Sequence, residues 1–268
     1  MRAYLEPRTS RAASWSRRAA VFSAVLLVMV GLSHRYGLLE TPASLGALAL
    51  VAVLAVAALL LAAISFRRVW YEGDRGGGEL TLGVLVALLV LTPFLVSAYR
   101  GAVYPALHDI STDLDDPPSL AVAARTRGPD MNPLAAMTPQ QRRLQAQSYP
   151  QVTGRRYELS FDRTFDTVMA LMERKGWKPI GPWLEAGGQS EITIDTVTYT
   201  TILAFPVDVA IRLINEGDTT YVDMRSASRY GRHDLGDNAA RIVAFLAELD
   251  IEIAAQAGAA PAEETPEE

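Results

Sequence analysis

In two segments of the C-terminal half of the chain, an arginine and an aspartate are separated by an even number of positions. Asp208 and Arg212 lie in the first segment, and Asp223 and Arg225 lie in the second. Because alternate residues of a β-strand point to the same face, each pair would project from one face of its strand. Groups placed in this way can form a cross-strand lattice of ion pairs. They can also form a recognition surface, because the planar arginine fork matches phosphate and carboxylate groups.

The segment that follows carries further groups able to hold an anion. Arg229, Arg232, His233 and Asp234 precede a predicted C-terminal helix, whose first N–H groups favour anions. The alternative interpretation is that Asp234 and Asn238 cap this helix and hold the preceding loop in place by hydrogen bonds. The sequence leaves both interpretations open. The candidate ligand-binding residues are therefore Asp208, Arg212, Arg225, Arg229, Arg232, His233 and Asp234.

An enzymatic function centred on His233, Asp234 and Asp208 is kept as an alternative. The His233-Asp234 pair resembles a dipeptide of metal-dependent phosphohydrolases, but the sequence lacks the further His and Asp ligands at helical spacing. Ser226 and Ser228 are the nucleophiles that a triad with His233 would use. Strand alternation points both serines toward the core, and the sequence has no nucleophile elbow. We therefore assign no catalytic residue.

The sequence also gives no reason to expect a metal or another cofactor. The acidic run Asp109–Asp115 has the spacing that begins a calcium loop, but Leu114 and Leu120 occupy the positions of the required glycine and glutamate. The chain contains no cysteine, which excludes disulfides, thiolate metal sites and cysteine nucleophiles. The net charge of −5 argues against nucleic acid as a partner.

Periodicity predicts a small α+β domain that positions these groups. Helical patterns occupy about 162–175 and 237–249, and strand patterns occupy 178–184, 191–198, 207–214 and 219–228. Turn residues at 215–218 predict a hairpin between the last two strands. The order helix, strands, helix favours an antiparallel sheet with helices packed on one face. Residues 105–150 are rich in Pro and Asp and are expected to form an arm that includes a short helix capped by Thr138.

Three apolar stretches in the first hundred residues predict transmembrane helices. They run from 19 to 33 or as far as 39, from 43 to 66 and from 80 to 99, and about 20 apolar residues are enough to cross a bilayer. A cleaved signal peptide is the alternative for the first stretch. The second and third stretches contain no Asp, Glu, Lys or Arg, which argues against a channel or pump built from this chain alone. The spans are expected to anchor the protein or to assemble with a partner membrane protein.

The distribution of arginine predicts the orientation of these spans. Arg2, Arg8, Arg11, Arg17 and Arg18 precede the first span, and Arg67, Arg68 and Arg75 follow the second, whereas the 34–42 loop carries only Arg35. The positive-inside rule then places the N-terminus in the cytoplasm and the C-terminal domain in the periplasm. The strong preference for arginine over lysine, together with abundant alanine, suggests a GC-rich bacterial genome. With the predicted spans, we therefore expect a protein of the bacterial inner membrane. The predicted organisation is a cytoplasmic tail (1–18), the transmembrane region (19–104), the arm (105–150), the α+β domain (151–253) and a disordered tail (254–268).

Motifs in the C-terminal half resemble those of a known family. The most specific is the run from Arg225 to Gly231, followed by Asp234-Leu235-Gly236 and by Asn238–Ile242. Upstream pieces that agree are His108–Asp113, Asp116-Pro117-Pro118, Tyr149-Pro150, Gly176-Trp177 and Phe205–Asp208. Together they resemble the bacterial and plastid domain-of-unknown-function family 1499 over residues 105–250. Members of that family often carry a second acidic residue where this chain has Val207, and the resemblance implies a domain rather than an activity.

These observations predict a membrane-anchored, non-enzymatic protein of the cell envelope. Its periplasmic domain would bind a partner or an anionic ligand of the envelope, and its spans would contact the lipid bilayer. The alternatives are a hydrolase-like enzyme around His233, and an accessory subunit of a membrane complex.

Overall fold

The computed structural model describes residues 10–181 and 190–259. The chain forms two compact units, one of residues 1–102 with 201–204 and one of residues 103–200 with 205–268. Predictions that fall on 1–9, 182–189 and 260–268, which include the start of the cytoplasmic tail and most of the predicted disordered tail, lie outside the described residues.

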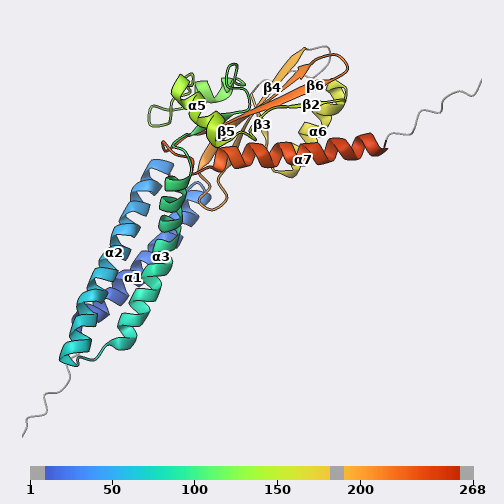
Figure 1. The fold of residues 1–268 in the computed structure, drawn as a ribbon. Coiled ribbons are helices and arrows are strands. Elements are labelled where there is room, and N and C mark those ends of the chain that lie inside the picture. Colours follow the sequence, from blue (N-terminus) through green and yellow to red (C-terminus); the bar gives the residue numbers. More distant parts are fainter. Residues whose placement is uncertain (1–9, 182–189, 260–268) are drawn as a thin grey trace, which may run out of the picture. The chain divides into compact units, whose positions relative to one another are not determined.

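The first unit contains three long helices, α1 (Arg11–Arg35), α2 (Thr41–Glu72) and α3 (Gly77–Val103) (Figure 1). Each is long and apolar enough to cross a membrane. The prediction of three candidate membrane-spanning helices is therefore confirmed. All three helices extend beyond the apolar stretches, because a helix continues into polar residues once it leaves the hydrocarbon core.

Small side chains hold the first unit together. Ala20, Ala58 and Ala87 form a buried cluster with one alanine from each helix. The Ser16 hydroxyl donates to the Ala58 carbonyl at 2.9 Å, and a Cβ at Gly83 would lie 2.7 Å from Ser16 Oγ. Since lipid tails are as apolar as leucine, membrane helices associate through close packing of this kind rather than through a hydrophobic driving force.

The second unit is built on one antiparallel sheet in the order β1-β6-β5-β4-β3, with β2 also paired to β6. The long strands are β4 (Glu191–Tyr199), β5 (Pro206–Asn215) and β6 (Thr220–Ser228), which match the predicted ones, and β5 and β6 form the predicted hairpin. The short strands are β1 (Asp109–Ser111), β2 (Arg155–Tyr157) and β3 (Pro179–Ile180). Only the start of the predicted strand at 178–184 is therefore a strand within the described residues.

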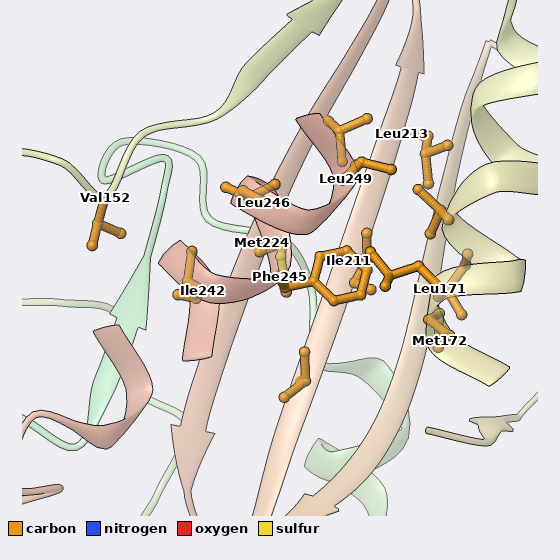
Figure 2. Close-up of a cluster of buried hydrophobic side chains, with 14 of the residues drawn as sticks. Val152, Leu171, Met172, Ile211, Leu213, Met224, Ile242, Phe245, Leu246 and Leu249 are labelled. Atoms are coloured by element: carbon orange, nitrogen blue, oxygen red, sulfur yellow. The ribbon is translucent and has the colours of Figure 1, made fainter. Parts of the chain in front are cut away.

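Helices α6 (Phe161–Arg174) and α7 (Asp237–Ala259) cover one face of this sheet with an apolar core. Figure 2 shows Phe245 of α7 beside Ile211 of β5 and Leu171 of α6. The Trp177 ring stacks on Phe245 with a centroid separation of 5.2 Å. The predicted class, a three-helix region followed by an α+β domain, is confirmed. Helix α7 continues ten residues beyond the predicted end at Leu249.

The segment expected to be an arm contributes elements to the second unit. It contains β1, α4 (Ala121–Thr126) and α5 (Pro139–Ser148). Helix α5 begins at the predicted Thr138 cap, which forms a capping box with Gln141. The buried Gln145 side chain donates to the carbonyl of Ser111 at 2.6 Å and accepts from its N–H at 3.3 Å, which joins α5 to β1. A three-residue strand is too short to show alternation, so β1 could not be predicted from periodicity.

We expect the substitution Phe245→Ala to destabilise the second unit by about 3–5 kcal/mol, the usual cost of removing a buried aromatic side chain. The ring is fully buried and contacts Trp177. Denaturant unfolding of the full-length protein in detergent, followed by near-ultraviolet circular dichroism, measures the effect. The control Tyr199→Ala removes an aromatic ring that is 59% exposed and should change the unfolding midpoint little. Equal effects of the two substitutions would contradict the assignment of the core.

Candidate functional site

The arginine and aspartate side chains of β5 and β6 lie on the face of the sheet opposite α6 and α7. Arg212 is the cross-strand neighbour of Asp223, and Ala210 is the neighbour of Arg225. The covering segment, which we define as residues 112–135, lies over this face. Its Leu120 and Ala123 pack on Ala210 and Ala227. The face that the sequence predicted to be a polar surface is therefore covered, and its charged groups form an internal layer.

Arg212 and Asp223 form the central pair of this layer. Arg212 Nε lies 3.0 Å from Asp223 Oδ1, and Nη2 lies 2.7 Å from Oδ2. The guanidinium also donates to the carboxylate and to the carbonyl of Asp116 in the covering segment, both at 2.8 Å. Hydrogen bonding to Asp223 raises the pKa of Arg212 above its usual value. The pair therefore fixes the covering segment to the β5–β6 hairpin.

Arg225 forms a second two-pronged pair, with Asp109 of β1. The distances are 2.9 Å from Nε to Oδ1 and 2.7 Å from Nη2 to Oδ2. Both side chains are buried. Since β1 has only three residues, this ion pair adds a side-chain link to the backbone pairing that holds the strand at the edge of β6.

Asp208 accepts hydrogen bonds from two arginines. Arg229 reaches it with Nη2 at 2.7 Å, and Arg127 of the covering segment reaches it with Nε at 2.8 Å and Nη2 at 2.7 Å. Arg127 also donates to the Ala227 carbonyl at 3.0 Å. The Asp208 residue is only 1% exposed, so its charge is compensated by the two guanidinium groups rather than by water.

Three of the candidate arginines, Arg212, Arg225 and Arg229, thus direct their guanidinium forks at buried or partly buried carboxylates. This geometry is the lattice that formed one of the two interpretations of the sequence. Sequence reasoning did not find the partners Asp109, Asp116 and Arg127, because they lie between 81 and 116 positions away from the residues they bind. The forks of these three arginines are occupied by protein groups.

Asp195 belongs to the same layer and was not among the candidates. Its Oδ2 accepts the Val122 N–H at 2.7 Å, at the start of α4. Its Oδ1 is buried and has no hydrogen-bond partner among the described residues. Burial raises the pKa of this carboxyl, the Val122 hydrogen bond opposes the rise, and the neighbouring Asp208 charge adds to it. Alternation in the predicted strand 191–198 could have placed Asp195 on the polar face, opposite to Ile194.

The loop before α7 holds the remaining candidates. Arg232 is exposed. His233 Nδ1 accepts the Leu235 N–H at 2.9 Å, and Nε2 lies within hydrogen-bond distance of the Tyr104 carbonyl, at 3.0 Å. The buried Asp234 accepts the N–H groups of Gly236 and Asn238, both at 2.9 Å. Contacts of this kind cap a helix and hold the preceding loop in place.

A polar cluster that the sequence did not predict lies between β6 and α7. The Ser226 hydroxyl donates to Asn238 Oδ1 at 2.9 Å. Asn238 Nδ2 donates to the His108 carbonyl at 2.9 Å and to Ser228 Oγ at 3.1 Å. Arg241 Nη1 donates to Asn238 Oδ1 at 2.8 Å and to Ser226 Oγ at 3.1 Å. The two serines therefore bind an amide rather than the imidazole that a catalytic triad would need.

Metal ligation finds no support in the part of the chain that the structure describes. Within residues 10–181 and 190–259, no group of three or more His, Asp or Glu side chains is arranged to hold a metal ion. Asp109 and Asp113, from the acidic run, lie close to Arg225 and Arg212 instead.

Comparisons with known proteins give a family but no activity. The model of a family described as "Protein of unknown function (DUF1499)" matches residues 109–249, which is more than half of the chain. No curated protein matches the chain. Among solved structures, the crystal structure of CalU16 from Micromonospora echinospora is 17% identical and covers 39% of this chain and 80% of that chain, with a TM-score of 0.24. That score is too low to support a statement about fold or function.

We expect Asp208→Asn to destabilise the second unit by about 3–5 kcal/mol, because removing one partner leaves buried charge uncompensated. Here both Arg127 and Arg229 would lose their carboxylate. Denaturant unfolding of the full-length protein measures the loss. The matched control Glu216→Gln breaks the exposed ion pair with Arg156 and should leave the midpoint almost unchanged. A similar midpoint for the two variants would show that the layer contributes little stability.

Asp195→Asn should stabilise the protein increasingly as the pH rises. The folded state raises the pKa of this carboxyl, so its ionisation opposes folding. This penalty is absent below the unfolded pKa of about 3.9 and develops fully once the pH passes the folded pKa. The stability difference between variant and wild type, measured by denaturant unfolding from pH 4 to pH 7, should therefore grow with pH. A difference that stays constant would contradict the assigned pKa direction.

Proposed function

The chain belongs to the DUF1499 family of proteins of unknown function, and we propose that this member is a membrane-anchored binding protein whose α+β domain lies outside the cytoplasm. The proposal concerns a multi-pass protein of the bacterial inner membrane. Its N-terminus would be cytoplasmic and its domain periplasmic.

The charge difference between the two ends of the helices carries this proposal. Arg11, Arg17 and Arg18 lie at the start of α1, and Arg67, Arg68 and Arg75 lie at the end of α2 and just after it. The opposite ends carry only Arg35 and Arg100. Arginine remains preferentially on the cytoplasmic side, so three crossings leave the chain after Val103 on the other side.

An anchoring role fits the helices better than transport. In the described parts of α1, α2 and α3, charged residues occur only toward the helix ends. Ion and proton pathways usually need charged groups within the spans. The large exposed side chains of these helices, such as Leu50, Leu60 and Leu89, are suited to contact lipid or a partner membrane protein.

Binding of an anionic ligand or partner is favoured over catalysis. The imidazole of His233 is engaged through both nitrogens, and Asp234 caps α7, which leaves the proposed enzyme centre without a base. Two arginines close to the loop before α7 lie outside the charged layer and can meet an anion. They are the exposed Arg232 and the largely buried Arg241, whose hydrogen bonds go to neutral oxygens.

The absence of cysteine from the sequence makes the topology directly testable. We expect a thiol introduced by Asp218→Cys, in the exposed β5–β6 turn, to react with a membrane-impermeant maleimide in intact spheroplasts. The matched thiol from Asp74→Cys, between α2 and α3, should react only after the membrane is permeabilised. The reverse pattern of labelling would overturn the proposed orientation, and labelling of both positions in intact spheroplasts would overturn the three-span topology.

A further inference from the structure

Arg241 differs from the other largely buried arginines of the second unit. Arg127, Arg212, Arg225 and Arg229 each pair with an aspartate. Within the described residues, no carboxylate lies at ion-pair distance from the Arg241 guanidinium, which hydrogen bonds only through Nη1, to Ser226 Oγ and Asn238 Oδ1. Burial lowers the pKa of Arg241, partly offset by the charges of Asp237 and Asp234.

The unused edge of this guanidinium is the one that binds oxyanions. Arginine has five N–H donors, and those on Nε and Nη2 form the fork that grips phosphate or carboxylate with two parallel bonds. In Arg241 neither atom has an acceptor within residues 10–181 and 190–259. Burying a charge without a counter-charge is costly, and an incoming anion would relieve that cost.

A second hydroxyl donor, that of Ser228, is held by the same Asn238 amide that binds Arg241. Ser228 Oγ accepts a hydrogen bond from Asn238 Nδ2, which leaves the Ser228 hydroxyl proton available to a ligand. The fully buried Asn238 amide thus receives Arg241 on its oxygen and holds Ser228 with its nitrogen. Ser228 and Arg241 are both partly exposed. The donors are therefore held in place before binding, which reduces the entropy cost of capturing a ligand.

The shape of the donor set favours phosphate over carboxylate. A carboxylate has two oxygens, and a two-pronged arginine contact occupies both. A phosphate monoester has three terminal oxygens, so it can accept from the Arg241 fork and from Ser228 at the same time. The carboxylates of Asp237 and Asp234 both act on the Arg241 charge, but neither lies at ion-pair distance from it, and Asp234 is held by the N–H groups of Gly236 and Asn238.

We infer that Arg241 and Ser228, oriented by Asn238, form a binding site for the phosphate group of a phosphate monoester. The inference rests on the proposed binding function and gives its anionic ligand a site. The phosphate can belong to a soluble compound or to the headgroup of a lipid such as phosphatidic acid.

Hydrogen exchange of the full-length protein in nanodiscs tests the site. One arm adds inorganic phosphate to phosphatidylcholine nanodiscs, and the other replaces part of the phosphatidylcholine with phosphatidic acid. We expect slower exchange in residues 226–241 in at least one arm. Protection by inorganic phosphate identifies a soluble source, and protection only by phosphatidic acid identifies a lipid source. No protection in either arm would overturn the inference.

Two variants distinguish binding at this site from non-specific attraction of anions to arginine. Arg241→Gln should weaken binding about ten- to a hundredfold, as expected for the loss of charged hydrogen bonds. The matched control Arg232→Gln removes an exposed arginine from the same segment and should change binding little. Equal losses in both variants would contradict the site. Unchanged exchange in β5 shows that a variant is folded. If Arg241→Gln unfolds, Ser228→Ala should still weaken binding severalfold, and unchanged binding there would also overturn the inference.

The two proposals can fail separately. Phosphate protection together with cytoplasmic labelling of the Asp218→Cys thiol would keep the site and overturn the extracytoplasmic location. Extracytoplasmic labelling without protection in either arm would keep the location and overturn the site.

Discussion

The arrangement of the second unit depends on the pairing of buried aspartates with arginines across one face of its sheet. Asp208 shows why, because its single carboxylate accepts from Arg229 at the end of β6 and from Arg127 in the covering segment. Charges at this depth are tolerated only when their partners stand at good hydrogen-bonding geometry. The position of β1, the course of residues 112–135 and the alignment of the β5–β6 hairpin are therefore linked through the same few groups.

The two faces of the sheet are packed through different interactions. Under α6 and α7, apolar side chains such as Ile211, Met224 and Phe245 are buried by the hydrophobic effect, which is strong but places few demands on geometry. On the other face, ion pairs select one arrangement of the covering segment. Arg241 belongs to neither system, because its hydrogen bonds go to neutral oxygens, and this exception is the basis of the proposed phosphate site.

Local patterns in the sequence predicted the regular elements well and the site incompletely. Alternation located β4, β5 and β6 within one or two residues, and Thr138 marked the start of α5. The sequence also placed Asp208, Arg212, Asp223 and Arg225 on one polar face. It did not reveal that this face is covered, because β1 and α4 are too short to produce a periodic signal and their partners lie far away in the chain.

The sequence by itself determined three apolar helices, an arginine bias between their ends, and an amphipathic α+β domain, because each of these follows from side chains that are close together in the chain. Only the tertiary structure decided which guanidinium groups are paired. Arg225 and Arg241 are equally charged in the sequence, but Arg225 meets Asp109 on β1, whereas Arg241 meets an amide and a hydroxyl. The physical reason is that the fate of a buried charge depends on the group opposite to it, and folding brings that group from a distant part of the chain.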